Sequence, residues 1–235
     1  MINVYFWQLD DQSEQIAKPL FRKLSSKEEI IKARNYRSRS ASNLYISGKI
    51  LQRLSLSHFD DKVAPSDWEF IFGKYGRPKV VDAQSTDIFF NVSKTKNSVV
   101  TAVCDNLIGI DLERLDANFE FDDLRPAFST DEITQIDNGP GGVNKDKILT
   151  LWTAKEAVSK FDGRGMGLPF DQLSCVEAGK GNVTVKSYIV NNTYALSIAS
   201  RTTSPVVNFF EYNCSSRSFC EGFKLSSVED VEYYI

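Results

Sequence analysis

The pattern of apolar and polar positions along the chain predicts a mixture of strands and helices. Alternation predicts a strand at 2–9, and apolar residues three and four positions apart predict helices over about 26–56. Short strands are expected near 68–72, 88–92 and 98–104, where β-branched and aromatic residues cluster between turn residues. These elements make up the first part of the chain.

The same order of elements starts again at residue 107. A strand at 107–113 is followed by predicted helices over about 129–137 and 146–161. Further strands are expected near 173–178, 183–190, 194–199 and 206–212. The stretch DNGPGGVNKD at 137–146 carries three glycines and a proline, and it predicts a mobile loop within the second helical region.

This repeated order predicts an α+β fold built from two similar halves. We place the first half at residues 1–106 and the second at 107–235, joined near 105–108. No short repeat is visible in the residues themselves, so the expected pseudo-two-fold relation between the halves rests on the order of the elements alone.

Composition narrows the class of protein. The chain has 235 residues, of which 42% are hydrophobic, with 13 glycines and 7 prolines, which excludes a mainly disordered or fibrous chain. A net charge of −3 argues against a general nucleic-acid coat. No stretch approaches the roughly 18 apolar residues of a membrane span. The opening residues MINVYFWQLDD lack the basic and long apolar regions of a signal peptide.

Cysteine and histidine content narrows the chemistry. No two of the cysteines form a Cys-x-x-Cys pair, so reduced thiols in a cytosolic protein are expected, acting as small hydrophobic residues. The four cysteines are Cys104, Cys175, Cys214 and Cys220. The one histidine, His58, argues against a His-rich zinc site and a Ser-His-Asp triad, and we expect it to be a surface or packing residue.

Basic residues are concentrated in 22–53. This segment carries nine lysines and arginines but only two acids, Glu28 and Glu29. One interpretation is a solvated helical face, and the other is a local site for anions such as phosphates. The sequence favours neither.

The segment LIGIDLER at 107–114 places two carboxylates on one face of a predicted strand. Its aliphatic residues point to one side, whereas Gly109, Asp111 and Glu113 point to the other. The two carboxylates are then about 7 Å apart along the strand. Acids are poor strand formers, so the arrangement indicates either exposure to water or a bound divalent cation. We expect Gly109 to leave space beside the pair, which favours the metal.

The predicted helix at 146–161 has two charged residues inside its apolar face. Lys155 and Glu156 both lie between large apolar side chains on the helical wheel. Snorkelling of Lys155 and a Glu156–Lys160 helix pair would account for them without a function. Glu156 fits that explanation less well than the lysines do, because a buried carboxylate needs a partner such as a metal ion.

Two weaker patterns carry groups that suit phosphate. KYGRPKV at 74–80 reads as a turn with Arg77 near its tip, and an arginine fork matches phosphate geometry. The strand IFFNVSKTKN at 88–97 ends with Ser93, Lys94 and Thr95, which can donate hydrogen bonds to phosphate. Each is also an ordinary surface turn or strand end.

Taken together, the four segments resemble the 4′-phosphopantetheinyl transferases of the Sfp type. That family's pattern is a Gly-Lys/Arg-Pro turn, Phe-Asn-x-Ser-His-Ser, Gly-x-Asp-x-Glu and Trp-x-x-Lys-Glu-x-x-x-Lys. The matching positions here are Gly76-Arg77-Pro78, Phe90-Asn91-Val92-Ser93-Lys94-Thr95, Gly109-Ile110-Asp111-Leu112-Glu113 and Trp152-Thr153-Ala154-Lys155-Glu156 through Lys160. The likeness covers 74–174 firmly and 20–56 only in general character.

The resemblance implies a magnesium-dependent enzyme of the holo-carrier-protein synthase type. Such an enzyme moves the 4′-phosphopantetheine arm of coenzyme A to a serine of an apo acyl or peptidyl carrier protein and releases 3′,5′-ADP. Family folds place the active site at the interface of the two halves in a single chain, so a monomer is expected, with no nucleic-acid or membrane partner. The implied magnesium ligands are Asp111, Glu113 and Glu156.

The resemblance also assigns roles to the cationic residues. Lys155 and Lys160 would contact phosphate oxygens, and Arg77 with Ser93 and Lys94 would hold the nucleotide end of coenzyme A. Glu156, or a water on the metal, would receive the serine proton, and the sequence does not choose between them. Glu156 and Lys160 are thus the candidate catalytic residues.

The chain departs from the family pattern at two places. Lys94 stands where the family has a histidine, and Asn43 and Leu44 occupy the usual place of an arginine that grips the 3′-phosphate of coenzyme A. Lys32, Arg37 or Arg39 are possible substitutes. These changes motivate a second hypothesis, a catalytically weakened relative that binds a carrier protein or nucleotide. An unrelated magnesium-dependent phosphohydrolase is a third.

Glu132 has two interpretations. Family members often carry an acid after the Phe-Ser pair, here Phe128-Ser129. The spacing Ser129-x-x-Glu132 is also a capping box at a helix start, and we favour the cap.

Overall fold

The computed structural model describes residues 1–81, 88–137, 144–173, 175–176, 182–202, 205–222, 225–227 and 231–233. The chain divides into two compact units. The first is Met1–Asn106 with Val206–Phe223, and the second is Leu107–Pro205 with Lys224–Ile235. Both contain helices and sheets, so the expected α+β class is confirmed. Residues 138–143 of the predicted mobile loop lie outside the described ranges.

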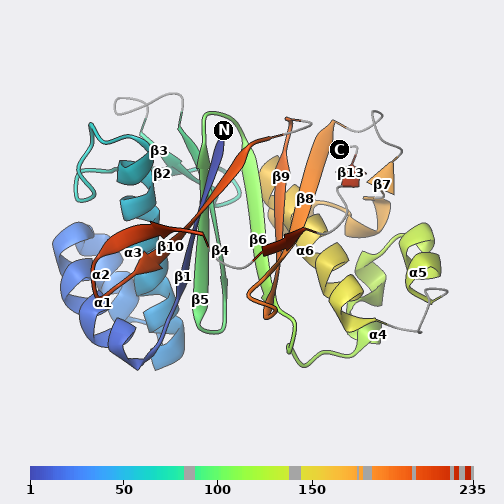
Figure 1. Cartoon of the computed structure of the whole chain (residues 1–235), viewed down its shortest axis with the longest axis horizontal. Helices are drawn as coiled ribbons and strands as arrows, with labels where there is room; N and C mark the ends of the chain where they lie inside the picture. The colour runs from blue at the N-terminus through green and yellow to red at the C-terminus, as the bar shows by residue number, and fades with distance from the viewer. Residues whose placement is uncertain are drawn as a thin grey trace. The chain divides into compact units, whose positions relative to one another are not determined.

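The first unit is built on a five-stranded sheet with the order β11-β10-β1-β5-β4. Its strands are β1 (Ile2–Gln8), β4 (Phe89–Thr95), β5 (Ser98–Cys104), β10 (Val207–Asn213) and β11 (Ser218–Glu221). The hairpin β4–β5 pairs antiparallel with β1, and β10 pairs parallel with the other edge of β1. Figure 1 shows β10, in red, running beside β1, in blue.

The pairing of β10 gives the first unit a segment that we expected in the second half. Residues 206–223 follow the second unit in the chain, yet Ile2 to Phe6 of β1 are in register with Val207 to Glu211 of β10. The alternating pattern predicted a strand near 206–212, and alternation alone does not say which sheet edge a strand joins.

Three helices accompany this sheet: α1 (Asp11–Leu24), α2 (Lys27–Arg34) and α3 (Arg39–Phe59). Helix α1 was not predicted, and it contains Pro19, a residue that usually breaks a helix interior. It forms nevertheless because Asp10 and Ser13 make a capping box and because Ala17, Phe21 and Leu24 are buried in the core. A separate hairpin, β2 (Phe70–Phe72) and β3 (Pro78–Val80), carries the predicted 74–80 turn.

The second unit has a sheet with the order β6-β9-β8-β13-β7, and β12 pairs with β8. The strands are β6 (Ile108–Arg114), β7 (Cys175–Val176), β8 (Val183–Val190), β9 (Tyr194–Ser200), β12 (Leu225–Ser227) and β13 (Val231–Tyr233). Helix α6 (Lys145–Asp162), yellow in Figure 1, packs along β6, β9 and β8. Shorter elements are α4 (Phe121–Leu124), η1 (Arg125–Ala127), α5 (Thr130–Asp137), η2 (Gly165–Gly167) and η3 (Phe170–Gln172).

The two units share a connectivity. In each, the opening strand pairs antiparallel with the second strand of a later hairpin, giving the local orders β1-β5-β4 and β6-β9-β8. A long helix packs on each set, α3 in the first unit and α6 in the second. The pseudo-two-fold relation between the halves stays a prediction. Within the described ranges, no helix combines the length and the apolar character needed to cross a bilayer.

Candidate functional site

Helix α6 lies unusually close to strand β6, and Gly109 is the reason. A Cβ atom on Gly109 would be 1.9 Å from the carbonyl oxygen of Ala157 and 2.5 Å from the amide nitrogen of Phe161. The face of β6 that carries Gly109, Asp111 and Glu113 is therefore the face that α6 covers. The alternation predicted that these residues share a face, but not that a helix covers it. The space that we expected beside Gly109 is filled by helix backbone rather than open to a ligand.

The close approach brings a carboxylate of β6 against a lysine of α6. Lys160 Nζ lies 2.5 Å from Asp111 Oδ1, as an ion pair and hydrogen bond. Asp111 is buried, with 4% of the residue exposed, whereas the Lys160 side chain is 27% exposed. A buried carboxylate is costly without a partner. Lys160 supplies one, and its own exposure leaves it able to reach other groups.

Glu156, one helical turn before Lys160, lies close enough to Asp111, Glu113 and Lys160 for their charges to act on its carboxylate. Burial raises the pKa of Glu156 above its ordinary value of 4.5, and the negative charges of Asp111 and Glu113 raise it further, while Lys160 opposes the shift. The two carboxylates of β6 thus interact electrostatically with a carboxylate of α6 that is distant in the sequence. A carboxylate with a raised pKa binds a cation or a proton more readily than an isolated one.

The donor chemistry of this trio fits a hard divalent cation. Carboxylate oxygens are the ligands that Mg²⁺ takes from proteins, commonly one or two together with phosphate oxygens. Among the described residues, no group of three or more His, Cys, Asp and Glu side chains is already arranged as a metal-ligand cluster. The Lys160 ammonium, in contact with Asp111, supplies the positive charge there. We call Asp111, Glu113, Glu156 and Lys160 the carboxylate–lysine cluster.

Lys155 is not placed for the phosphate contact that we expected. Its residue is fully buried, and its ammonium lies 2.5 Å from Glu132 Oε2. It also donates hydrogen bonds to the carbonyl oxygens of Phe170 at 2.7 Å and Leu173 at 2.6 Å. A lysine ammonium has three N–H donors. With these three acceptors around its ammonium, Lys155 is anchored inside the second unit.

Glu132 forms the predicted capping box. The Ser129 amide donates to Glu132 Oε2 at 2.8 Å, and the Glu132 amide donates to Ser129 Oγ at 3.3 Å. The cap that we favoured is therefore confirmed. The sequence did not reveal the second contact of the same carboxylate, because Lys155 is 23 positions further along the chain.

In the first unit, Arg77 lies in the predicted turn. The Gly73 amide donates to the carbonyl of Arg77 at 2.9 Å and closes the β2–β3 hairpin, and Gly76 adopts a positive φ of 81°. This left-handed conformation favours glycine. The arginine is half-buried next to exposed Tyr75 and Phe72.

Ser93 and Lys94 lie on β4, opposite helix α3. Ser93 is buried and Lys94 is exposed. The aliphatic part of Lys94 crosses Gly48, where a Cβ atom would be 2.8 Å from Lys94 Cε. The Lys94 ammonium lies 5.6 Å from the centre of the Tyr45 ring. The family's histidine position is therefore occupied by a cation that reaches along α3.

A second lysine reaches the same tyrosine. Lys32 Nζ, from α2, also lies 5.6 Å from the Tyr45 ring centre. Of the possible substitutes for the missing arginine, Lys32 thus lies near Lys94. Arg39 pairs instead with Glu14 of α1 at 2.8 Å. We call Lys32, Tyr45 and Lys94 the lysine–tyrosine cluster. A cation over an aromatic ring is a common recognition element, and the sequence pattern did not show this one.

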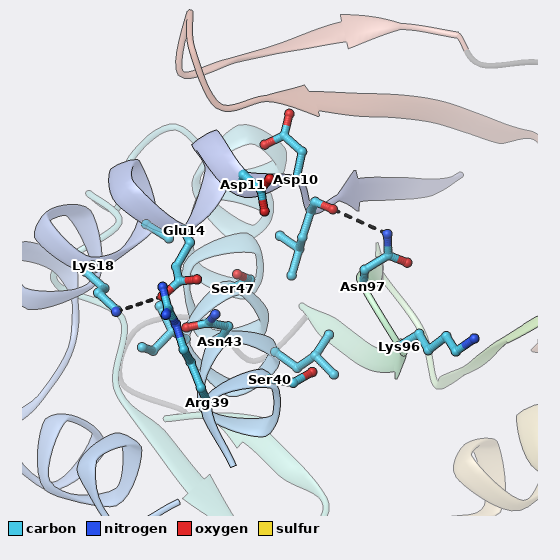
Figure 2. A pocket seen from close by; sticks show the side chains of 14 residues that line it. Asp10, Asp11, Glu14, Lys18, Arg39, Ser40, Asn43, Ser47, Lys96 and Asn97 are labelled. Carbon is cyan, nitrogen blue, oxygen red and sulfur yellow. Dashed lines mark hydrogen bonds and ion pairs between the residues drawn. The ribbon is translucent and has the colours of Figure 1, made fainter.

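A cavity of about 420 Å³ in the first unit is lined by α1, α3 and the β4–β5 turn (Figure 2). Asn43 and Leu44, at the place of the usual arginine, line it. Figure 2 shows Glu14 between Lys18 and Arg39, and each cation lies 2.8 Å from Glu14 Oε1. The two cations lower the pKa of Glu14 to about 2. Of the residues that the sequence suggested for coenzyme A binding, Arg39 lines this cavity, whereas Arg77, Ser93 and Lys94 are not among its lining residues.

His58 is a packing residue, as predicted. Its Nδ1 lies 3.0 Å from the hydroxyl of Tyr5, and its ring makes edge contacts with Phe210 and Phe219. Burial lowers the pKa of His58 below 6.5. Three of the cysteines, Cys104, Cys214 and Cys220, are free thiols, and the side chain of Cys175 lies outside what the structure describes.

Comparison with known proteins agrees with the sequence motifs. Residues 107–210 match the family model of the 4′-phosphopantetheinyl transferase superfamily. A protein of Synechocystis sp. named as a 4′-phosphopantetheinyl transferase is 26% identical over 157 residues, which cover 66% of this chain and 63% of the relative. The 4′-phosphopantetheinyl transferase Sfp of Bacillus subtilis is 24% identical over 210 residues, covering 85% and 92%. A transferase of Aneurinibacillus migulanus is 30% identical over 100 residues, covering 43% and 40%. The resemblance seen in the sequence is thereby confirmed.

Proposed function

Because the chain is a member of the 4′-phosphopantetheinyl transferase superfamily, we propose that it transfers the 4′-phosphopantetheine arm of coenzyme A to a serine of an apo acyl or peptidyl carrier protein. The serine oxygen forms a bond to the β-phosphorus of coenzyme A. The bond between that phosphorus and the bridging oxygen breaks, and 3′,5′-ADP leaves. The serine proton passes to a base.

The observation that carries this proposal is the carboxylate–lysine cluster. Asp111 and Glu113 on β6 face the helix that bears Glu156 and Lys160, and the charges of both acids raise the pKa of Glu156. These three carboxylates would hold Mg²⁺. When bound, this ion neutralises a diphosphate and stabilises the charge that develops on the leaving oxygen.

Lys160 is the residue that we assign to the phosphates. It is paired with Asp111 at 2.5 Å, and its side chain remains 27% exposed. Its ammonium can therefore exchange its contact with Asp111 for a contact with a phosphate oxygen as negative charge develops there. Glu156 is a candidate base, because its raised pKa makes it a better proton acceptor than an ordinary glutamate. A water molecule is the alternative acceptor.

Residues of the first unit are proposed for the nucleotide end of coenzyme A. Arg77 and Ser93 offer a guanidinium and a hydroxyl, as the resemblance implies. The lysine–tyrosine cluster adds two ammonium groups near one aromatic ring. We propose that Lys32 and Lys94 together supply the positive charge that the missing arginine and histidine would give. Lys155 has no part in phosphate binding in this proposal.

The proposal also covers the partner protein, the oligomeric state and the cellular compartment. The acceptor is an apo carrier protein, and neither a nucleic acid nor a membrane takes part. The chain acts as a monomer in the cytoplasm, since its two units lie on one polypeptide. A catalytically weakened, carrier-binding relative is the second candidate, favoured by Lys94 at the histidine position.

The test is a mass measurement on the carrier. The protein is incubated with coenzyme A, Mg²⁺ and a panel of apo carrier proteins, and each carrier is weighed by mass spectrometry. Gain of one phosphopantetheine on a carrier supports the proposal, and loss of the gain in EDTA supports the metal. No gain on any carrier rejects the transferase. Binding of a carrier without mass gain would favour the second candidate.

A further inference from the structure

The ion pair of Lys155 and Glu132 lies directly beside the proposed site and takes no part in the chemistry assigned above. Both residues are almost fully buried, at 0% and 2% exposed. Replacing a buried ion pair with apolar residues often leaves stability unchanged or raises it, so stability alone is a weak reason for such a pair. The position of Lys155 next to Glu156 offers another reason.

Lys155 ties helix α6 to separate segments of the second unit. Its ammonium contacts Glu132 at the start of α5, the carbonyl of Phe170 in η3 and the carbonyl of Leu173 just after it. The same ammonium lies 5.7 Å from the centre of the Phe128 ring. Since these acceptors come from two separate stretches of chain, the end of the Lys155 side chain is fixed in direction as well as in distance.

A second contact fixes helix α6 on the side that packs against β6, away from Lys155. The carbonyl of Ala157 lies over Gly109 of β6, where no Cβ atom could fit. Successive residues of an α-helix are about 100° apart around the axis, so residues 155 and 157 lie about 200° apart. Glu156 lies between the two contacts. The rotation of α6 about its axis is therefore set from both sides of Glu156.

We propose that Lys155 is a positioning residue, which acts through its contacts with Glu132, Phe170 and Leu173 to hold Glu156 toward Asp111 and Glu113. This inference rests on the proposed function, because it concerns the metal-binding arrangement of the carboxylate–lysine cluster. Partners that orient metal ligands typically change metal affinity about 10- to 100-fold when they are mutated. Lys155 acts in this way through the helix and contacts neither metal nor substrate.

The test replaces the pair without leaving a buried unpaired charge. In the double variant K155M/E132Q, methionine keeps most of the lysine stem, and the glutamine oxygen still accepts from the Ser129 amide. The control is T153V, which removes the buried hydrogen bond between Thr153 and Ser197, 2.8 Å long, from the same helix. Mn²⁺ affinity is measured by electron paramagnetic resonance, and thermal stability is measured for each protein.

We expect the double variant to bind Mn²⁺ about 10- to 100-fold more weakly than the wild type, and T153V to stay within about twofold. Equal affinity in the double variant and the wild type would overturn the positioning role. If the double variant does not fold, E132D takes its place: it keeps both charges and shortens the acid by one methylene, and the same loss of affinity is expected.

Crystal structures, which do not depend on metal binding, distinguish a failure of this inference from a failure of the proposed function. If wild-type protein binds no Mn²⁺, the carboxylate assignment fails, and crystal structures of the wild type and the variant then decide the positioning role. The proposal requires the Glu156 carboxylate to move away from Asp111 in the variant. An unmoved Glu156 would contradict it.

Discussion

Gly109 of β6 lies directly against the main chain of Ala157 in α6, so close that a methyl group in place of its hydrogen would be 1.9 Å from the Ala157 carbonyl oxygen. The main chain of Ala157 cannot move aside as a flexible side chain could. The presence of glycine in the Gly-x-Asp-x-Glu segment therefore has a packing cause. It allows the helix with Glu156 and Lys160 to reach the strand with Asp111.

The change G109A is the first prediction. Overpacking of this kind costs about 3 kcal/mol of unfolding free energy or more, because helix or strand must shift. We expect a large drop in the denaturation midpoint and loss of transfer. The matched control is G167A, where the nearest side-chain atom to a new Cβ is 3.9 Å away. Equal stability of G109A and the wild type would show that α6 does not pack as described.

The second prediction concerns Asp111. The change D111A removes the partner of Lys160 and one proposed metal ligand. We expect transfer to fall by at least about 100-fold and Mg²⁺ binding to weaken, while the fold is retained. Transfer is followed by carrier mass, Mg²⁺ binding by titration calorimetry, and the fold by circular dichroism. A D111A protein with full activity would refute the metal assignment.

The third prediction is a pH dependence of stability. The pKa of Glu156 is raised above 4.5 in the folded chain, by burial first and by the neighbouring acids second. The folded state therefore keeps this proton to higher pH than the unfolded state. The resulting stability is full below pH 4.5 and is lost as the pH rises through the raised pKa.

The variant E156Q tests this sign. Without metal, in EDTA, it should melt at a higher temperature than the wild type near neutral pH and at the same temperature near pH 4. The exposed acid Asp123 supplies the control, since D123N should change the melting temperature little at either pH. An E156Q variant that is less stable than the wild type at neutral pH would contradict the raised pKa.

The fourth prediction concerns Lys94. In K94M the ammonium near Tyr45 is lost, and we expect the KM for coenzyme A to rise about tenfold, the effect of roughly 1.4 kcal/mol, with kcat little changed. The family residue is restored in K94H, which should stay within a few-fold of the wild type. A large gain in kcat for K94H would instead support a catalytically weakened relative.

Much of this structure could be predicted from local patterns. Strands β1, β5, β8 and β9 lie at or within one residue of where the sequence placed them, because runs of β-branched, aromatic and other apolar residues between turn residues mark each one. The opposing faces of β6 were predicted from the alternation of side chains along a strand. What depends on a partner was not predicted. Helix α1 was missed, since it needs its buried face to offset Pro19. Strand β10 was predicted, but its pairing with the edge of β1 was not.

The candidate site likewise has some features that local patterns predict and others that depend on tertiary packing. Asp111, Glu113 and Glu156 could be found from their types and spacing, since a carboxylate on a half-buried face needs an explanation. The buried contacts of Lys155 could not be predicted, because the pattern that places it in the apolar face does not reveal that Glu132 and two carbonyl groups lie there. Nor could the sequence bring Lys32 to Tyr45, because that contact depends on how α2 packs against α3.

The most direct measurement of the central claim is a crystal structure of the wild-type protein grown with Mn²⁺ and coenzyme A, with the anomalous signal of manganese recorded. We predict one manganese peak within bonding distance, about 2.0–2.3 Å, of carboxylate oxygens from Asp111, Glu113 and Glu156, with Lys160 turned toward phosphate. A manganese ion bound elsewhere, or these three carboxylates directed away from the diphosphate, would contradict it.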